Sequence, residues 1–293
     1  MRKPRVKRAA SVFLLGLLSF SAFLLSSGRL RVTSDTGLVG PEIVAPVIPE
    51  LRPVPDAPLF RDVSDLPDLR LRAAAGILYN PKTHEVLWAT HGLEQRPMAS
   101  ITKVMTALVF LHEKRDLSRD VVISRSDVRR ASTTYLRRGE RVSLKDLLHL
   151  ALIASDNAAA RVLARVSPWG TVGFVDQMNQ KAAELGFDDT SFVDSSGLDE
   201  RNLSTAYDLA RLIAYASEDP TISRIMRKRS YRMRTSRRRL TVRNTNRLLR
   251  GRHVIHGGKT GYIDEAGYCV AAVVKLPGSD PLALVVLGAR SNS

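Results

Sequence analysis

The chain of 293 residues is long enough for one large domain or two small ones, and for a substantial hydrophobic core. Apolar residues make up 44% and charged residues 25%, which is ordinary for a globular protein. The formal net charge of +16 is unusual and favours an anionic partner such as nucleic acid, acidic lipid or a carboxylate-rich polymer. The single cysteine, Cys269, excludes an intrachain disulfide, and its apolar neighbours predict a small buried side chain.

The N-terminus predicts export. Five basic residues among the first eight precede an apolar run over residues 12–25, a pattern typical of a secretory signal. The run is short for a membrane span, and residues 26–28 are small enough for cleavage, although no Ala-x-Ala site is present. We therefore expect residues 1–28 to be a signal peptide or signal anchor. The protein would then act in the periplasm or at the outer face of the cytoplasmic membrane, touching the membrane only through this segment if it is retained.

Residues 29–70 contain seven prolines, which fix φ and remove backbone donors. This density predicts a linker without regular structure, followed by a folded domain over residues 71–293. The domain begins with two short apolar runs, 74–79 and 85–89, around a Pro-containing turn, which predict a β-hairpin. Helical spacing of apolar residues then predicts helices over 98–114, 144–154, 157–166 and 206–216.

Two valine-rich runs near the C-terminus, 269–274 and 282–287, flank a Pro-Gly turn and predict a second hairpin. The order is thus hairpin, helices, strands. It predicts an α+β fold in which both chain ends build one antiparallel sheet, with flanking helices and a helical insertion.

The segment Ser100-Ile101-Thr102-Lys103 opens a predicted helix. Residues three apart share a helix face, so the Lys103 ammonium can reach the Ser100 hydroxyl. A serine needs a base beside it to become a nucleophile. A lysine can serve when burial and nearby positive charge bring its pKa to about 7–8, and Lys259 is a candidate source of that charge. A helix N-terminus would also favour a developing oxyanion.

Two further motifs also supply hydroxyl and amine groups that serine acyl-transfer chemistry can use. Ser155-Asp156-Asn157 falls at a turn between two predicted helices, and Lys259-Thr260-Gly261 heads a predicted strand. Each motif alone has an ordinary explanation: a helix cap beside a solvated lysine, a second helix cap, and a surface turn. All three in this order and in fitting contexts favour a serine acyl-transfer enzyme.

Together the motifs resemble those of the low-molecular-mass penicillin-binding proteins, the D-alanyl-D-alanine carboxypeptidases and endopeptidases. The resemblance covers about residues 70–290, and the fold that it implies is the penicillin-binding transpeptidase and β-lactamase-like fold. Other segments similar to family patterns are 139–148, 194–198, 202, 204–208, 244–249 and 266–269.

The resemblance implies a role for each motif residue. Ser100 would be the acylated nucleophile, Lys103 its base and Ser155 part of the proton relay to the leaving group. The backbone N–H groups of Ser100 and Tyr262 would form the oxyanion hole. Water would hydrolyse the acyl-enzyme, and β-lactams would acylate Ser100 as covalent inhibitors.

Substrate contacts follow from the same resemblance. Asn157 would hold the substrate backbone, while Lys259 and Thr260 would bind its terminal carboxylate. Gly261 would let the peptide lie against the strand edge, as β-augmentation requires. The partners implied are peptidoglycan peptides.

Several activities remain open at this stage: endopeptidase, carboxypeptidase, β-lactamase, or a wall-binding protein without catalysis. The chain ends soon after Gly261, without the second β-rich domain of the larger carboxypeptidases, which favours the endopeptidase type. The helix that follows the last strand in the family would also be absent. No glutamate motif for deacylation is evident, which disfavours a β-lactamase, and intact motif residues disfavour a non-catalytic binder.

Residues 224–252 contain thirteen lysines and arginines and no acid. Nucleic acid could explain them, but export and the lack of interleaved aromatics argue against it. Attraction to an anionic cell-wall polymer and a merely solvated basic face remain. The six histidines lack metal-ligand spacing, so no metal or other cofactor is expected. His256 could line the cleft or be structural, and without Gly-x-Ser-x-Gly a Ser-His-Asp hydrolase has no support.

Overall fold

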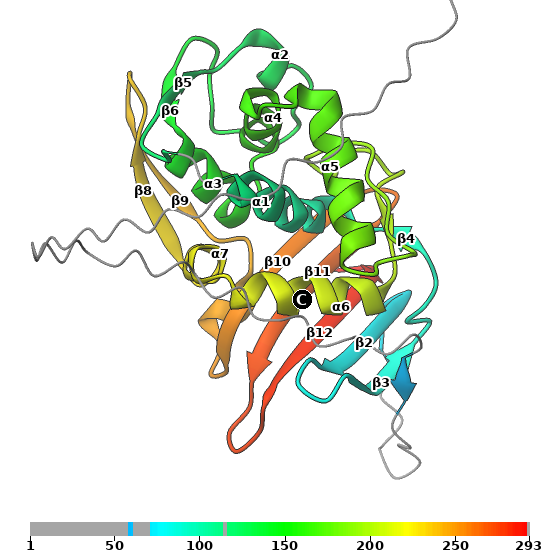
Figure 1. Cartoon of the computed structure of the whole chain (residues 1–293). Helices are drawn as coiled ribbons and strands as arrows, with labels where there is room; N and C mark the ends of the chain where they lie inside the picture. The colour runs from blue at the N-terminus through cyan, green and yellow to red at the C-terminus, as the bar shows by residue number, and fades with distance from the viewer. Residues whose placement is uncertain (1–57, 61–70, 114–115, 292–293) are drawn as a thin grey trace, which may run out of the picture. The chain divides into compact units, whose positions relative to one another are not determined.

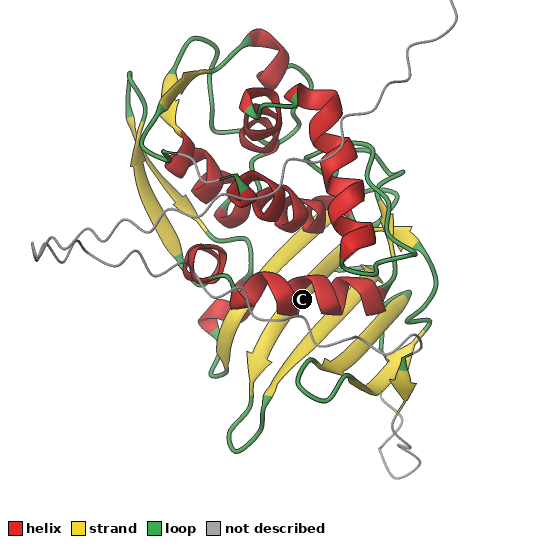
Figure 2. Cartoon of the chain, in the orientation of Figure 1, coloured by secondary structure: helices red, strands yellow, loops and turns green. Residues whose placement is uncertain are grey.

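The computed structural model describes residues 58–60, 71–113 and 116–291. Its strands and helices form the predicted α+β fold (Figure 1), with a six-stranded sheet beside a group of helices (Figure 2). The strand order is β1-β3-β2-β12-β11-β10, antiparallel throughout except for the parallel pair β1 and β3. The strands are β1 (Leu59–Phe60), β2 (Ala75–Asn80), β3 (Glu85–Thr90), β10 (Val254–Ile263), β11 (Gly267–Lys275) and β12 (Pro281–Ala289).

The two ends of the folded region meet in the middle of this sheet. β2 pairs with β12, with Ile77 opposite Val285, so strands about two hundred residues apart are neighbours. Ile77 and Val285 are buried, since alternate side chains of a strand point to one face. That face is covered by α6 (Ala206–Glu218), which packs across β2, β12, β11 and β10 (Figure 1). This arrangement confirms the predicted sheet built from both chain ends.

Most of the remaining helices form a layer beside α6, with α1 at its centre, while the short helices η1, η2 and α7 contact β10 directly. α1 contacts α3, α4, α5 and α6. The elements are η1 (Ala99–Thr102, 3-10), α1 (Lys103–His112), α2 (Arg125–Val128), α3 (Leu144–Ile153), α4 (Asn157–Val166), α5 (Gly170–Glu184), α7 (Pro220–Met226) and η2 (Arg247–Arg250, 3-10). The four predicted helices are confirmed to within a few residues, except that the first begins as the 3-10 turn η1.

Three small antiparallel pairs were not anticipated. They are β4 (Arg96–Pro97) with β7 (Leu203–Ser204), β5 (Asp120–Val122) with β6 (Arg141–Ser143), and β8 (Ser230–Arg234) with β9 (Arg239–Arg243). The pair β8–β9 falls in the arginine-rich stretch, where charge hides the alternation that signals a strand. The helices α2, α5, α7 and η2 were also not anticipated.

The Lys-Thr-Gly motif lies inside β10, so the prediction that it heads a strand is wrong in position. Pairing with β11 runs through it, with Lys259 opposite Ala271 and Thr260 opposite Val270. The preceding glycines, Gly257 and Gly258, look like a turn in sequence. Both lie in β10, and glycine is required there because neighbours approach the backbone too closely for a side chain: a Cβ at Gly257 would lie 2.3 Å from the Ser217 hydroxyl.

The linker prediction fails at Leu59 and Phe60, which form β1 beside β3. The outer edge of β3 offers unpaired backbone groups, and the segment after Pro58 has no proline at the pairing positions. The rest of the predicted linker, residues 29–57 and 61–70, and the predicted signal segment 1–28 lie outside the described residues, so these domain boundaries stay predictions. In the ranges that are described, no helix has the length and hydrophobicity needed to cross a membrane.

Candidate active site

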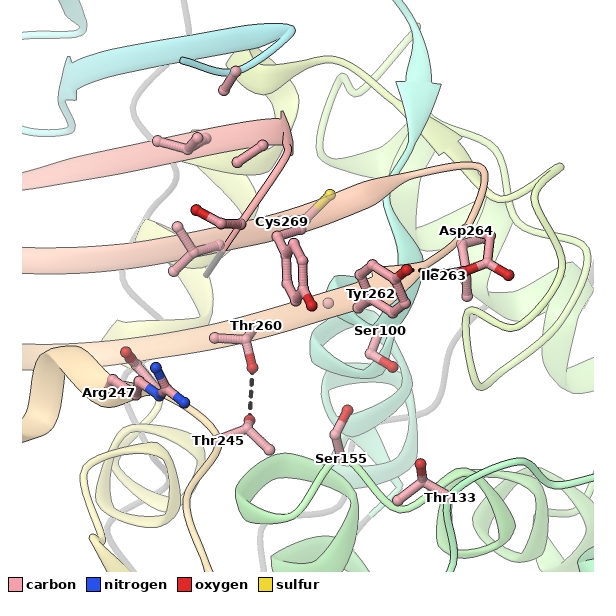
Figure 3. A pocket seen from close by; sticks show the side chains of 18 of the residues that line it. Ser100, Thr133, Ser155, Thr245, Arg247, Thr260, Tyr262, Ile263, Asp264 and Cys269 are labelled. Carbon is pink, nitrogen blue, oxygen red and sulfur yellow. Dashed lines mark hydrogen bonds between the residues drawn. The ribbon is translucent and has the colours of Figure 1, made fainter. Parts of the chain in front are cut away.

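Ser100 sits in η1, directly below the exposed edge strand β10, and is only 8% exposed. Lys103, one helical turn on, donates a hydrogen bond from Nζ to Ser100 Oγ at 2.7 Å. The predicted contact between the two side chains is therefore present. Figure 3 shows the Ser100 hydroxyl in the pocket with that of Ser155, which lies on the turn between α3 and α4.

All three protons of the Lys103 ammonium have acceptors. Besides Ser100 Oγ, they are Asn157 Oδ1 at 2.6 Å and the carbonyl oxygen of Ser196. The side chain is fully buried. Burial is the largest cause that lowers the pKa of Lys103, to about 7, while the carboxylates of Asp194 and Asp156 raise it. A group with this pKa can hold and release a proton near neutral pH.

The positive charge of Arg161 adds to this lowering. Lys259 is itself buried, and burial together with the positive charge of Lys103 holds the pKa of Lys259 well below its usual range. Its ammonium donates to Ser155 Oγ at 2.8 Å and to the carbonyl oxygen of Thr260 at 2.6 Å. Charge repulsion between the two lysines is mutual, so Lys259 stays a candidate source of the charge that lowers the pKa of Lys103, and burial is the larger cause at both lysines.

A cleft of about 880 Å³ opens above these groups. Six of the eight predicted site residues line it: Ser100, Ser155, Asn157, Thr260, Gly261 and Tyr262. Lys103 and Lys259 lie behind this lining. Lys259 Nζ is 2.8 Å from the hydroxyl of the cleft residue Ser155, and its predicted contact with a substrate carboxylate stays a prediction. Thr260 is at the surface instead, donating to Thr245 Oγ1 at 2.6 Å (Figure 3).

Gly261 is where β10 touches the serine. A Cβ at this position would lie 2.9 Å from both the Ser100 backbone nitrogen and Ala99 Cβ, so only glycine permits the approach. Tyr262 follows, with a half-exposed side chain that donates from its hydroxyl to Asp264 at 2.8 Å. No contact described here tests the oxyanion hole, which stays a prediction.

Asn157 has both amide atoms engaged: Oδ1 accepts from Lys103, and Nδ2 donates to the Ala131 carbonyl at 2.8 Å. One amide hydrogen and one lone pair remain for a ligand. Asp156 caps α4, accepting from the Ala159 N–H at 2.9 Å and from the Tyr135 N–H. The predicted helix-to-helix turn therefore also ties the loop at residues 131–135 to the site.

The backbone is strained around the reactive groups. Ala99 and Ser155 both have left-handed φ values, 47° and 58°, which are uncommon for residues with a Cβ. Ala99 directly precedes Ser100, and Ser155 itself bears the second hydroxyl that faces the cleft. Such strain persists only where surrounding contacts fix it, and it is concentrated at functional sites.

Sequence reasoning gave no role to the turn at Asp194. Its carboxylate accepts from the backbone N–H groups of Ser196, Gly197 and Asp199. This holds the Ser196 carbonyl towards Lys103. Gly197 has φ 76°, and a Cβ there would meet the Ala99 carbonyl at 2.0 Å. An aspartate followed by Ser-Ser-Gly is a turn signal, and only the fold shows that this turn faces a lysine.

Two further residues considered in the sequence are His256 and Cys269. His256 does not line the cleft, and its carbonyl accepts from Ser223 Oγ at 2.8 Å. Cys269 is buried as predicted, and burial raises the pKa of its thiol to about 11. Within the described ranges, no three His, Cys, Asp or Glu residues gather as metal ligands would.

The α+β fold with a serine and a buried lysine one turn apart defines a serine acyl-transfer enzyme of the penicillin-binding class. The chain belongs to the D-alanyl-D-alanine carboxypeptidase family of serine peptidases, whose pattern it matches over residues 62–291.

Similar proteins are named for both activities of this family. The D-alanyl-D-alanine endopeptidase of Escherichia coli is 34% identical over 224 residues, 75% of this chain and 72% of the relative. That of Pseudomonas aeruginosa is 36% identical with the same coverage. A D-alanyl-D-alanine carboxypeptidase of Bacillus subtilis is 31% identical, and the match covers 81% of this chain and 62% of the relative.

Solved structures agree on the fold. A putative penicillin-binding protein homolog from Mycobacterium tuberculosis superposes with a TM-score of 0.72 and 28% identity, covering 76% of this chain and 86% of the other. A variant of a Streptomyces DD-transpeptidase gives 0.70 and 28%, covering 75% and 92%. The sheet from both chain ends and the helical layer are thus shared with these proteins.

Proposed function

We propose that this protein hydrolyses D-alanyl peptide bonds of peptidoglycan through an acyl-enzyme at Ser100. The observation that carries the proposal is the 2.7 Å contact between Ser100 Oγ and a fully buried Lys103. With a pKa lowered to about 7, a large fraction of Lys103 is the neutral amine at neutral pH. The amine lone pair then accepts the hydroxyl proton, which reverses the direction of this hydrogen bond.

Acylation follows from that geometry. Ser100 Oγ forms a bond to the carbonyl carbon of the D-alanyl residue while its proton passes to Lys103. The resulting oxyanion is held by the backbone N–H groups of Ser100 and Tyr262. When the peptide C–N bond breaks, the leaving amine takes a proton from the Ser155 hydroxyl, which is replenished from the lysines. Water then attacks the ester and frees Ser100.

Substrate binding uses the edge of β10. The peptide adds to this edge as an extra strand beside Thr260 and Gly261, where no side chain blocks it. Asn157 offers its remaining amide hydrogen and lone pair to the peptide backbone. Lys259 lies beneath the cleft lining, where its charge and its 2.8 Å hydrogen bond to Ser155 Oγ act on the Ser155 hydroxyl. Thr260 binds the substrate carboxylate.

Endopeptidase activity is favoured over carboxypeptidase activity. The relatives named endopeptidases match this chain at 34% and 36% identity over 72% of their own length. Relatives named carboxypeptidases match at 28–32% identity, four of them over 57–62% of their own length and one over 75%. Digesting cross-linked and uncross-linked muropeptides tests this: an endopeptidase releases products from the cross-linked dimers first.

Labelling with a fluorescent penicillin tests the acyl-enzyme. We expect the wild type to be labelled covalently and Ser100→Ala to remain unlabelled while keeping its melting temperature. Folded wild type that takes no label would instead support a wall-binding protein without catalysis. Secretion of an alkaline-phosphatase fusion to residues 1–70 tests the proposed export to the periplasm.

A further inference from the structure

The arginine-rich stretch forms a hairpin with one charged face. On β8, Arg232 and Arg234 are exposed while Met233 between them is buried. The apolar side of the hairpin packs on α3, and Figure 1 shows β8 and β9 beside this helix. Since successive side chains of a strand point to opposite faces, Arg232 and Arg234 are turned outward together.

This outward row does not stop at the end of β9. Exposure alternates along the chain from the hairpin into the cleft, with buried or half-buried residues at every second position. The outward residues, in order, are Arg239, Thr241, Arg243, Thr245 and Arg247. At about 3.3 Å per residue, β9 contributes roughly 13 Å of this row, and the chain then bends at Thr245 before η2. We call these five residues, with Arg232 and Arg234 on β8, the arginine track.

The track ends inside the candidate active site. Thr245 and Arg247 both line the cleft, and Thr245 accepts the hydrogen bond from Thr260 on β10. Figure 3 shows Arg247 at the cleft beside Thr245 and Thr260. A chain bound at β10 can therefore continue onto the track.

The track is also unbalanced in charge. No acidic residue occurs from position 220 to 263. Arg238, on the hairpin but outside the track, pairs with the buried Glu140 at 2.7 Å. Arg232, Arg234, Arg239 and Arg243 are exposed on this segment without carboxylates, so they present a row of positive charge.

The hairpin is a fixed platform. The ring of Tyr231 stacks on His149 of α3 at 3.8 Å, and its hydroxyl donates to Asp146 at 2.7 Å. Lys228 donates to His149 Nε2 at 3.0 Å, which requires a neutral imidazole, and burial lowers the pKa of His149 to about 4. The track is thus held in place at neutral pH.

We propose that the arginine track binds the anionic groups of the cell-wall polymer that carries the scissile peptide, as a second binding site outside the cleft. This rests on the proposed function. The track would hold negative charges of one wall strand while a peptide of that strand occupies the cleft. It would speed reaction with the polymer and leave small soluble substrates unaffected.

Other polyanions fit less well. The only aromatic residue of the hairpin, Tyr231, is already stacked on His149, so no ring is free to stack on nucleic-acid bases. The track and the turn at residues 235–238 expose no apolar side chain to insert into a lipid surface. A polymer recognised by its charges alone is what remains.

The test compares two variants that each lose four charges. The track variant replaces Arg232, Arg234, Arg239 and Arg243 by glutamine. The control replaces the exposed cations Arg119, Arg125, Lys275 and Arg290, which lie outside the track. Cosedimentation with isolated cell walls, at several salt concentrations, measures binding without requiring cleavage. Hydrolysis of a small D-alanyl-D-alanine peptide and penicillin labelling measure the cleft alone.

We expect the track variant to bind walls at least about tenfold more weakly at low salt and to show a shallower salt dependence, since each ion contact with a polyanion adds to that slope. The control should bind like the wild type, and both should keep full activity on the small peptide. Amidating the carboxyl groups of the walls should weaken binding of the wild type, and removing wall phosphodiesters with hydrofluoric acid should leave it unchanged; the opposite pattern would overturn the assignment to the peptide-bearing polymer.

Equal wall binding by both variants would overturn the proposal, as would a parallel loss on the small peptide. If the track variant lost binding to double-stranded DNA in a gel-shift assay but bound walls like the wild type, the track would be assigned to nucleic acid instead. If wild type neither takes penicillin nor cleaves the peptide, the proposed function fails, and wall binding still reports on the track.

Discussion

At the residue scale, Lys103 carries the chemistry because it is buried. Its ammonium sits among three oxygen acceptors with no water exposure, and desolvation disfavours its charge. Lys103→Arg keeps a cation that cannot give up its proton. We expect penicillin acylation to fall by roughly a thousandfold, within the range for loss of a general base. Stopped-flow acylation rates measure this, and a rate within threefold of wild type would contradict the assigned base.

The pH dependence has a definite sign. Lys103 is the neutral base only above its pKa, so acylation should rise as pH increases through about 7. The Asp194 carboxylate favours the ammonium and raises that pKa. Asp194→Asn removes the charge but keeps one acceptor oxygen for the turn. We therefore expect the acid limb of the acylation profile to move to lower pH.

Asp194 is a positioning residue, because it acts through the Ser196 carbonyl and through its charge. The maximal rate of Asp194→Asn should also fall by about tenfold, since the amide cannot replace all the charge-assisted hydrogen bonds. A purely structural role would lower the rate without moving the limb. Asp194→Glu, with its charge retained, should leave the limb in place.

At the element scale, β10 brings the Lys-Thr-Gly motif to the serine, and Gly261 sets how closely. Gly261→Ala places a methyl group 2.9 Å from the Ser100 nitrogen, a contact that real Cβ atoms do not make. We expect β10 and η1 to separate and penicillin acylation to fall at least about a hundredfold, as misplacement of reacting groups by about 1 Å does.

The matched control is Gly251→Ala, after η2, where the nearest atom to a new Cβ is 3.3 Å away and φ is −77°. It should acylate like the wild type. Thermal melting of both variants separates local displacement from unfolding: a Gly261→Ala protein that melts normally and acylates normally would refute the role given to this approach.

At the scale of the whole molecule, the sheet joins the two ends of the folded region through β12. Val285 is fully buried on the α6 side of the sheet, and Val286 is half-buried on the other. We expect Val285→Ala to lower the free energy of unfolding by about 2 kcal/mol, from lost burial and the cavity left behind. Val286→Ala should cost less than half of that.

Urea denaturation with tryptophan fluorescence measures both free energies. Because β12 lies between β11 and β2, loss at Val285 should destabilise the described domain as one cooperative unit. Two separate transitions in the Val285→Ala protein, or equal costs for the two valines, would contradict this account.

The sequence by itself determined the strands and helices whose apolar residues repeat at a regular period, and hence the α+β class. It also determined the pairing of Ser100 with Lys103, because a contact between residues three positions apart in a helical turn depends only on local backbone geometry. The hairpin β8–β9 and the strand character of the Lys-Thr-Gly segment escaped it, since arginines and glycines carry little hydrophobic pattern.

Only the tertiary structure decided the rest. Lys259, Asp194 and Ser196 reach the site from segments far apart in sequence, and the burial that lowers the pKa of both lysines exists only once helices and sheet are packed. The same packing exposes alternate residues from 239 to 247 and places Thr245 and Arg247 at the cleft. Side-chain chemistry is local, but desolvation and proximity belong to the folded chain.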